Sequence, residues 1–185
     1  MKNHLNNKKI IGYSGKRSVL AINFYQKYKR DFIFRCYKSN IENEKKFVKW
    51  LDKNKDINTF INFAALVSTE KCEKFKKKAL STNYKSVVKM LKIFKKKKLN
   101  NFEYFLSISS SHVFKKSNNK LYENSLKIPS NYYGRTKLLM EKYILKNYKK
   151  FYFKIGIARI FNYFDQKYKR GYFINDITKK ISNNK

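Results

Sequence analysis

Tyr133 and Lys137 stand four residues apart, a spacing that places both side chains on one face of a helix. A free phenol has a pKa of about 10, so a tyrosine is a poor base near neutral pH unless a neighbouring cation lowers that pKa. The Lys137 ammonium is such a cation. The run Ser109-Ser110-Ser111 ends a β-type segment upstream, and one of its hydroxyls would hold the reacting oxygen. These residue types predict proton transfer at a carbonyl or alcohol carbon.

Spacing alone does not single out this pair. With 15 Tyr and 39 Lys in 185 residues (45 Lys and Arg less six Arg), random placement produces roughly three Tyr-x-x-x-Lys pairs. Three are present, namely Tyr25/Lys29, Tyr133/Lys137 and Tyr163/Lys167. Only the sequence around each pair can therefore indicate which of the three is functional.

A chain of 185 residues suits one domain with a sizeable core. Its formal charge of +33 ordinarily suggests a nucleic acid or an anionic membrane as partner. However, the basic residues are overwhelmingly Lys, whereas bidentate phosphate recognition favours Arg. Lys, Asn, Ile, Phe and Tyr are frequent, the skew that the codons of an AT-rich genome impose. We interpret the charge as a solvated lysine surface and expect no nucleic-acid partner, with nucleic-acid binding left as the alternative.

Cysteine and histidine are too few for a disulfide framework or a metal site, with two of each in the chain. No apolar run approaches the roughly 20 residues that a membrane span needs. The N-terminal residues carry charge without the apolar core of a signal peptide. We expect a cytoplasmic, reduced protein with no metal and no membrane partner.

A glycine turn follows the first predicted strand, residues 8–11. It reads Gly12-x-x-Gly15-x-x-Ser18 and leads into a helix-like run over residues 19–28. In a strand, turn and helix unit, glycines let backbone N–H groups approach a pyrophosphate at the helix N-terminus. The motif alone leaves open a chance glycine turn.

A second strand is predicted over residues 31–37. In a dinucleotide-binding fold, the residue that contacts the adenosine ribose lies just beyond this strand, and an acidic residue there favours NAD. Here the nearby residues are Arg35 and Lys38, with no acid before Glu42. Positive charge favours the 2′-phosphate of NADP, so we expect NAD or NADP, with NADP preferred. An ordinary basic surface remains the alternative.

Strands and helices alternate through the rest of the chain. Residues 59–67 predict a buried strand that runs into a small-residue turn at Ala64 and Ala65, which leaves room for a ligand. Further along, the patterns predict a helix over 85–94, a strand over 102–108, a helix over 133–144 and a strand over 151–160. The alternation predicts an α/β fold, a Rossmann-type doubly wound parallel sheet with helices on both faces.

In this order the motifs resemble the extended short-chain dehydrogenases/reductases that modify nucleotide sugars, the NAD-dependent epimerase/dehydratase family. The matching positions lie along nearly the whole chain. They are Gly12-x-x-Gly15, Asn62-Phe63-Ala64-Ala65, Asn83, Ser109-Ser110-Ser111-His112-Val113-Phe114, Tyr122-Glu123, Pro129, Tyr133-Gly134-Arg135-Thr136-Lys137 and Glu141. The segment between Val113 and Lys137, and Arg159-Ile160-Phe161-Asn162, are similar to the 4-keto-6-deoxysugar reductases.

The resemblance implies a role for each candidate site residue. Tyr133 would be the catalytic acid/base, Lys137 would bind the nicotinamide ribose and lower the tyrosine pKa, and Ser110 would position the sugar oxygen. The expected cofactor contacts are Gly12, Gly15, Ser18, Arg35, Lys38, Ala64, Ala65 and Lys137. The expected substrate contacts are Ser111, His112 and Asn162. Dehydratases of the family carry an acidic pair where this chain has Ser111-His112, which argues against dehydration.

The resemblance also implies the domain organisation and the partners. Residues 1–150 would form the NAD(P)-binding domain, and residues 151–185 the last strand and the start of a shortened substrate-binding region. The expected activity is reduction or epimerisation of a nucleotide-linked keto sugar by hydride transfer, in a homodimer like those of relatives. The alternative is a non-catalytic Rossmann-like protein that binds a nucleotide or an acidic partner through its charge.

Overall fold

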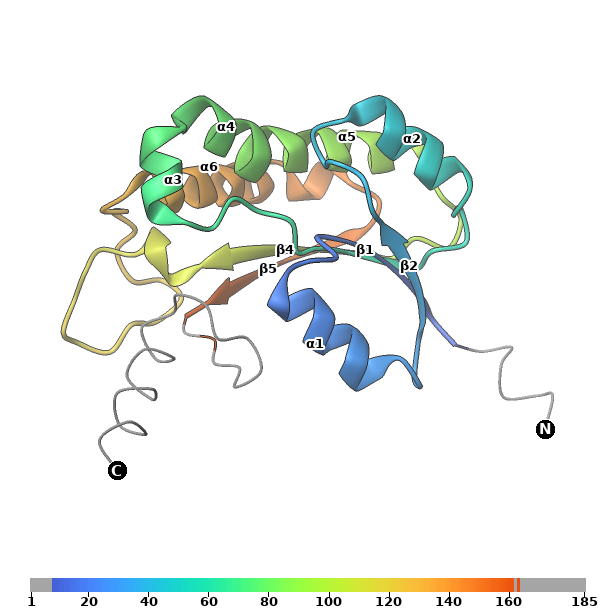
Figure 1. The fold of residues 1–185 in the computed structure, drawn as a ribbon, viewed down its shortest axis with the longest axis horizontal. Helices are drawn as coiled ribbons and strands as arrows, with labels where there is room; N and C mark the ends of the chain where they lie inside the picture. Colours follow the sequence, from blue (N-terminus) through green and yellow to red (C-terminus); the bar gives the residue numbers. More distant parts are fainter. Residues whose placement is uncertain (1–7, 162, 164–185) are drawn as a thin grey trace.

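In the part of the chain that the structure describes, five parallel strands form one sheet in the order β2-β1-β3-β4-β5 (Figure 1). The computed structural model describes residues 8–161 and 163. The strands are β1 Ile10–Ser14, β2 Ile33–Tyr37, β3 Thr59–Asn62, β4 Tyr104–Ser110 and β5 Lys154–Ile160. Because neighbouring strands pair in parallel throughout, their carboxyl ends meet at one edge of the sheet.

Helices cover both faces of this sheet (Figure 1). Among the described residues, α1 (Val19–Tyr28) lies alone on one face, and the other helices lie on the opposite face. These are α2 Glu44–Asp52, α3 Thr69–Lys74, α4 Lys76–Leu80, α5 Ser86–Lys97 and α6 Tyr132–Asn147, with short turns η1 Ser81–Lys85, η2 Ser111–Val113 and η3 Tyr148–Lys150. The Rossmann-type doubly wound sheet predicted from the alternation of strands and helices is confirmed.

Polar side chains mark where several helices begin. Asn43, Ser68 and Asn131 precede α2, α3 and α6, and each side-chain oxygen accepts a hydrogen bond from the backbone N–H three residues on. These bonds satisfy N–H groups that the first turn of a helix leaves without partners. At the other end of α5, Lys98 adopts a left-handed conformation, with φ 44°, which stops the helix.

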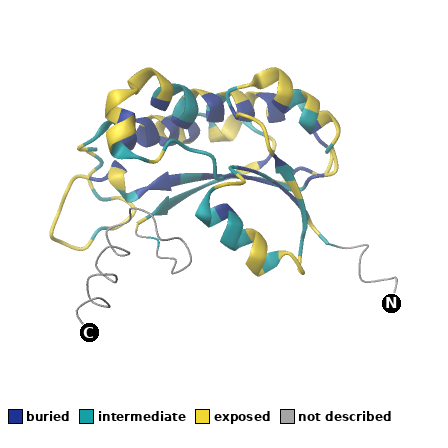
Figure 2. Ribbon diagram, in the orientation of Figure 1, coloured by how far each residue is buried: buried dark blue, intermediate teal, exposed yellow. Residues whose placement is uncertain are grey.

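An aromatic core fills the space between the sheet and the helices α2 and α5. Phe47, Phe60, Phe94 and Phe105 are each at most 1 % exposed, and buried segments of the strands and of the helices above them face one another in Figure 2. The Phe60 ring packs against the other three, at centroid distances between 5.4 and 5.6 Å. Burying each such side chain contributes roughly 1.5–3 kcal/mol. This core therefore holds α2 and α5 against the sheet whose carboxyl edge is described below.

The first strand differs from its prediction. β1 spans Ile10–Ser14 instead of residues 8–11, so Gly12 lies inside the strand and not in the turn. A Cβ at Gly12 would lie 2.9 Å from the Phe60 ring and 3.1 Å from the Trp50 ring. Glycine at this position thus lets α2 pack closely onto the sheet, which the sequence pattern of a glycine turn did not reveal.

The segment after β3 also differs, because the strand predicted over residues 59–67 ends at Asn62. The backbone of Leu66 instead bonds to the Asn83 side chain, which donates to its C=O at 3.0 Å and accepts from its N–H at 2.8 Å. The chain then forms the short helices α3 and α4. Their short, lysine-rich sequences lack the apolar periodicity that predicts a helix.

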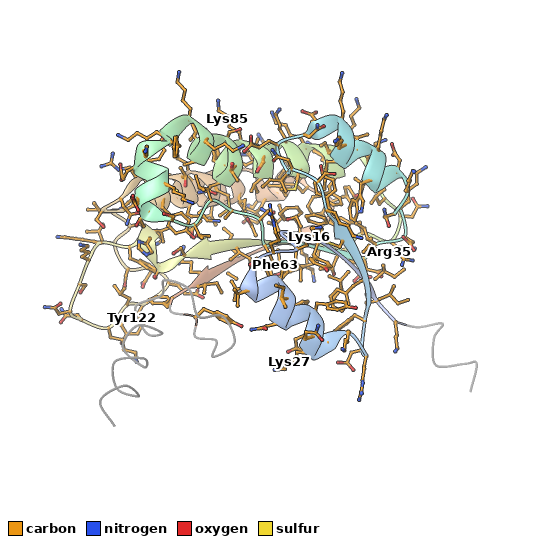
Figure 3. All side chains as sticks on the ribbon, viewed as in Figure 1. Lys16, Lys27, Arg35, Phe63, Lys85 and Tyr122 are labelled. Carbon is orange, nitrogen blue, oxygen red and sulfur yellow. The ribbon has the colours of Figure 1, made fainter. Side chains whose placement is uncertain are left out.

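Lysine side chains cover much of the outer surface. Lys27 and Lys85, for example, are exposed and point away from the sheet (Figure 3). No helix in the described part of the chain is long and apolar enough to cross a membrane. Within residues 8–161 and 163, no group of three His, Cys, Asp or Glu side chains is arranged to hold a metal ion.

Candidate active site

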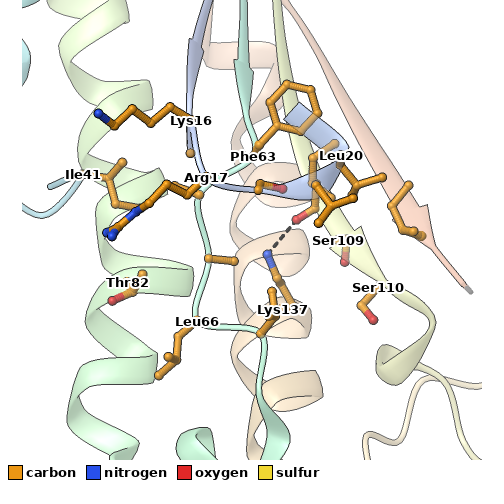
Figure 4. A pocket seen from close by; sticks show the side chains of 18 of the residues that line it. Lys16, Arg17, Leu20, Ile41, Phe63, Leu66, Thr82, Ser109, Ser110 and Lys137 are labelled. Carbon is orange, nitrogen blue, oxygen red and sulfur yellow. Dashed lines mark hydrogen bonds between the residues drawn. The ribbon is translucent and has the colours of Figure 1, made fainter. Parts of the chain in front are cut away.

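The carboxyl ends of the strands border a cavity of about 880 Å³ (Figure 4). Its lining includes residues 15–20 before and within α1, residues 37–42 at and after the end of β2, and residues 63–67 after β3. The end of β4 and the α6 residues Tyr133 and Lys137 complete one side. Ligands of doubly wound sheets bind outside these strand ends. The cavity is therefore the candidate active site.

The turn before α1 approaches the loop after β3 backbone to backbone. Gly15 has φ +77°, and a Cβ there would lie 2.6 Å from the Ala64 nitrogen. Ser18 at the start of α1 makes no side-chain capping bond, unlike the residues that begin α2, α3 and α6. Backbone N–H groups at the start of α1 are thus available to an anionic ligand in the cavity.

Tyr133 and Lys137 share one face of α6, as their spacing predicts, and both are buried. The Lys137 ammonium lies 5.8 Å from the centre of the Tyr133 ring. It also donates a hydrogen bond of 2.7 Å to the Ile108 carbonyl of β4, the dashed line in Figure 4. This bond holds the cation at the end of β4, beside the tyrosine.

Burial shifts the protonation of Lys137, which is only 3 % exposed. Desolvation lowers the pKa of its ammonium to about 8, and the nearby Cys72 and Glu141 partly oppose this shift. The cation beside Tyr133 is therefore present below that pH and is lost above it.

We expect the wild-type protein to gain stability relative to Lys137→Met as the pH rises from about 8 to about 10.5. In this window the unfolded state holds a proton that the folded state has lost, so raising the pH favours folding. Below pH 8 both states are protonated, and the difference between the two proteins stays constant. Denaturant unfolding at pH values on both sides of 8 measures it.

Lys142→Met is the matched control, because Lys142 is exposed on the same helix. This variant should follow the wild-type dependence on pH. If wild type and Lys137→Met instead ran parallel through the whole window, the lowered pKa of Lys137 would be wrong.

The three serines at the end of β4 have different surroundings. The Ser109 hydroxyl donates to the buried Glu141 carboxylate at 2.5 Å, whereas Ser110 accepts from the His112 backbone N–H at 3.3 Å. Ser110 lines the cavity near Tyr133, as does His112. Ser111 is not among the lining residues. Of the three serine hydroxyls, the Ser110 hydroxyl is therefore best placed to form a hydrogen bond with the reacting oxygen of a ligand.

The predicted cofactor residues divide between two places. Gly15, Ser18, Lys38, Ala64, Ala65 and Lys137 line the cavity. Gly12 and Arg35 do not, because they pair with each other in the middle of β1 and β2. The Arg35 guanidinium instead lies 3.7 Å from the Asp56 carboxylate, on the flank of the sheet (Figure 3). Asn162 lies outside the described residues.

Sequence reasoning did not assign a role to Arg17, which lines the cavity beside Lys16 (Figure 4). Its signal was its place two residues after the second glycine of the turn, in a chain with few arginines. Asn83 is one of the positions that match the family, but the resemblance implied no role for it. Its Nδ2 also donates to Thr136 Oγ1 at 3.1 Å, so Asn83 ties the loop after β3 to α6.

The acidic residue at the β2 side of the cavity is already engaged. Glu42 accepts hydrogen bonds from Lys78, at 2.9 Å, and from Thr82. Burial by itself raises the pKa of Glu42, but these bonds outweigh it and hold the pKa below its ordinary value. With Glu42 paired, Arg17 and Lys38 leave this part of the cavity positively charged.

The sheet order, the glycine turn before α1 and the Tyr133/Lys137 pair define the class, a Rossmann domain of the short-chain dehydrogenase/reductase type. The family model described as the RmlD substrate binding domain matches residues 11–185, and the chain belongs to that family. No curated protein sequence matches significantly.

Solved structures share this fold at low sequence identity. A dTDP-4-dehydrorhamnose reductase from Bacillus anthracis in complex with NADP has a TM-score of 0.78 and 17 % identity, over 97 % of this chain and 61 % of its own. RMD from Pseudomonas aeruginosa, complexed with NADPH, has a TM-score of 0.79 and 17 % identity over 95 % of this chain and 62 % of its own.

A UDP-N-acetylglucosamine 4-epimerase from Methanobrevibacter ruminantium, in complex with UDP-N-acetylmuramic acid, is similar to the same extent. Its TM-score is 0.79 at 18 % identity, over 97 % of this chain and 64 % of its own. The chain thus spans less than two thirds of the length of these three proteins.

Proposed function

We propose that this chain binds NADP(H) and contributes the catalytic residues for reduction or epimerisation of a nucleotide-linked keto sugar. The convergence of the Gly15 turn, Ser110 and the Tyr133/Lys137 pair on one cavity carries the proposal. Residues 1–150 would bind the cofactor, and residues 151–185 would begin the substrate side. Because the chain spans less than two thirds of the length of the similar solved structures, the activity of a complete enzyme is also proposed here.

The chemistry of the cavity fits a nicotinamide dinucleotide. The uncapped start of α1 offers backbone N–H groups to a diphosphate. Arg17 and Lys38 offer positive charge to a 2′-phosphate, which supports NADP over NAD. Lys137 offers ammonium N–H groups to a ribose hydroxyl. When bound, the nicotinamide supplies the hydride.

Tyr133, Lys137 and Ser110 would manage the proton and the charge of the reaction. As the carbonyl carbon of the sugar accepts a hydride, its oxygen takes the Tyr133 phenolic proton, and the ketone becomes a secondary alcohol. The Lys137 ammonium stabilises the phenolate that remains. Ser110 donates a hydrogen bond to the same oxygen and fixes its position. In the oxidising direction Tyr133 accepts the alcohol proton.

The substrate class is supported by the family and by the nucleotide-sugar enzymes that share the fold. Nucleotide sugars combine a diphosphate with a polar ring, and the cavity offers both cations and hydroxyl groups. Ser111, His112 and Asn162 remain proposed substrate contacts.

Titration with NADPH and NADH, followed by nicotinamide fluorescence, tests the cofactor. We expect micromolar affinity, about −8 kcal/mol, with NADPH bound more tightly than NADH. Lys38→Met should reduce this preference, whereas Lys85→Met, on the outer surface, should leave it intact. NADPH oxidation on addition of dTDP-4-dehydrorhamnose then tests the reaction. Failure to bind either nucleotide would contradict the proposal.

Salt dependence separates this function from a non-catalytic protein that binds nucleic acid through its charge. Binding that depends on many phosphate contacts weakens steeply with added salt. A dinucleotide held mainly by backbone N–H groups should lose much less affinity. Tight, strongly salt-dependent binding of an unrelated oligonucleotide, without NADPH binding, would favour the non-catalytic alternative.

We expect Gly15→Ala to weaken NADPH binding by roughly tenfold or more. A left-handed conformation costs a non-glycine residue about 1–2 kcal/mol, and the new Cβ would displace the Ala64 backbone. Gly156→Ala in β5 is the control, because its Cβ would meet the Tyr104 side chain of the neighbouring strand β4, away from the cavity. Both variants should lose stability in denaturant, but only Gly15→Ala should lose cofactor affinity in the same titration.

A further inference from the structure

His112 stands beside the proposed acid/base. It belongs to the turn η2 after β4 and lines the cavity, with its ring edge-on to that of Tyr133 at a centroid distance of 5.6 Å. A Cβ at Gly134 would lie 2.1 Å from the His112 carbonyl oxygen. The glycine next to Tyr133 thus lets η2 lie directly against the start of α6.

The Asn131 side chain determines which nitrogen of His112 carries the proton. Its Oδ1 accepts the Gly134 backbone N–H at 2.8 Å, the capping bond of α6, so the orientation of the amide is fixed. Its Nδ2 must therefore be the atom that lies 2.8 Å from His112 Nδ1. An amide NH₂ only donates, so Nδ1 must accept, and the proton of the neutral imidazole resides on Nε2.

We propose that His112 presents an Nε2–H donor to the cavity and selects sugars that carry an acceptor oxygen beside the reacting carbonyl. Asn131 does not line the cavity, so the nitrogen opposite to it is the one available to a ligand. The acceptor would be a hydroxyl or carbonyl oxygen of the sugar ring. The identity of the ligand depends on the proposed function, whereas the position of the proton does not.

Nitrogen NMR of the imidazole tests the position of the proton. The chain has only two histidines, so in a His4→Gln background every imidazole signal belongs to His112. We expect the ¹⁵N shifts of the neutral ring to show a protonated Nε2 and an unprotonated Nδ1. The opposite pattern, or an equal mixture of both, would overturn the assignment without any ligand being present.

Asn131→Asp reverses the arrangement while keeping the helix cap. Aspartate caps helices about as well as asparagine, but its carboxylate only accepts, so the neutral His112 must place its proton on Nδ1. We expect the two ¹⁵N shifts to exchange their character at a pH where the ring is neutral. An unchanged pattern would mean that Asn131 does not control the proton.

Substrate selection is tested with NADPH and dTDP-4-dehydrorhamnose. His112→Phe keeps a ring against Tyr133 but has no donor, and should raise KM for the sugar nucleotide about tenfold while kcat changes less. His112→Gln regains a donor and should restore most of the loss, and neither variant should change NADPH affinity. An unchanged KM in His112→Phe would overturn the selection.

The failures of the two proposals are distinguishable. If the wild-type chain binds no NADPH, or binds it and leaves the sugar unreduced, the proposed function fails while the ¹⁵N measurement still reports the donor. The sugar nucleotide is added together with NADPH. If the enzyme reduces the sugar nucleotide while the His112 Nε2 signal stays unmoved, His112 does not contact the sugar, and the proposed selection by His112 is wrong.

Discussion

Tyr133→Phe is expected to lower the rate of NADPH-dependent reduction of dTDP-4-dehydrorhamnose by about 10²- to 10⁴-fold, the usual contribution of a general acid. The substitution removes one hydroxyl and keeps the ring, which is 8 % exposed and lies beside the Lys137 ammonium. NADPH affinity should stay nearly constant, because the phenol acts on the sugar oxygen. Single-turnover rates and the fluorescence titration measure the two effects separately.

Tyr132→Phe is the matched control, since it makes the same chemical change one residue earlier. Tyr132 does not line the cavity, and its ring instead lies 5.7 Å from the Lys76 ammonium. Its turnover should equal that of the wild type. A Tyr133→Phe protein that still turned over at the wild-type rate would remove Tyr133 from the mechanism.

Arg159→Met is expected to cost about 3–5 kcal/mol of folding stability, the effect of leaving a buried charge without its partner. The Glu141 carboxylate is fully buried and accepts from Arg159 Nε at 3.0 Å and Nη2 at 2.9 Å. The guanidinium also donates to the Glu123 carbonyl at 2.9 Å and lies over the Phe114 ring. Urea unfolding measures the loss as a lower midpoint, and the dependence of the unfolding free energy on urea concentration should stay unchanged.

Arg35→Met makes the same change at an ion pair of the opposite kind. The Arg35 and Asp56 side chains are about half exposed and 3.7 Å apart, so the loss should stay below about 1 kcal/mol. Arg159→Met combined with Glu141→Met should recover part of the stability lost by Arg159→Met alone, because the buried Glu141 carboxylate that lost its partner is then also removed. Equal losses at Arg159 and Arg35 would contradict the argument from burial.

The sequence by itself determined the alternation of strands and helices, and with it the fold. The helix predicted over residues 19–28 coincides with α1, and the Tyr133/Lys137 pair lies on one face of α6 as its spacing requires. These features are local, because the helical and strand periods and the freedom of glycine act within a few residues. The small residues Ala64 and Ala65 predicted room for a ligand, and the resemblance of the ordered motifs to a family added the expected roles of the site residues.

Only the tertiary structure decided which of these residues meet. Gly12 and Arg35 belong to the middle of neighbouring strands, because the parallel register pairs them with each other. The surroundings of Lys137, which lower its pKa, come from elements far apart in the sequence. Asn131 controls the proton of His112 because a glycine in α6 lets η2 approach the helix. Strand register, desolvation and close packing depend on residues that are far apart in the sequence. Local sequence patterns therefore do not predict them for an individual residue.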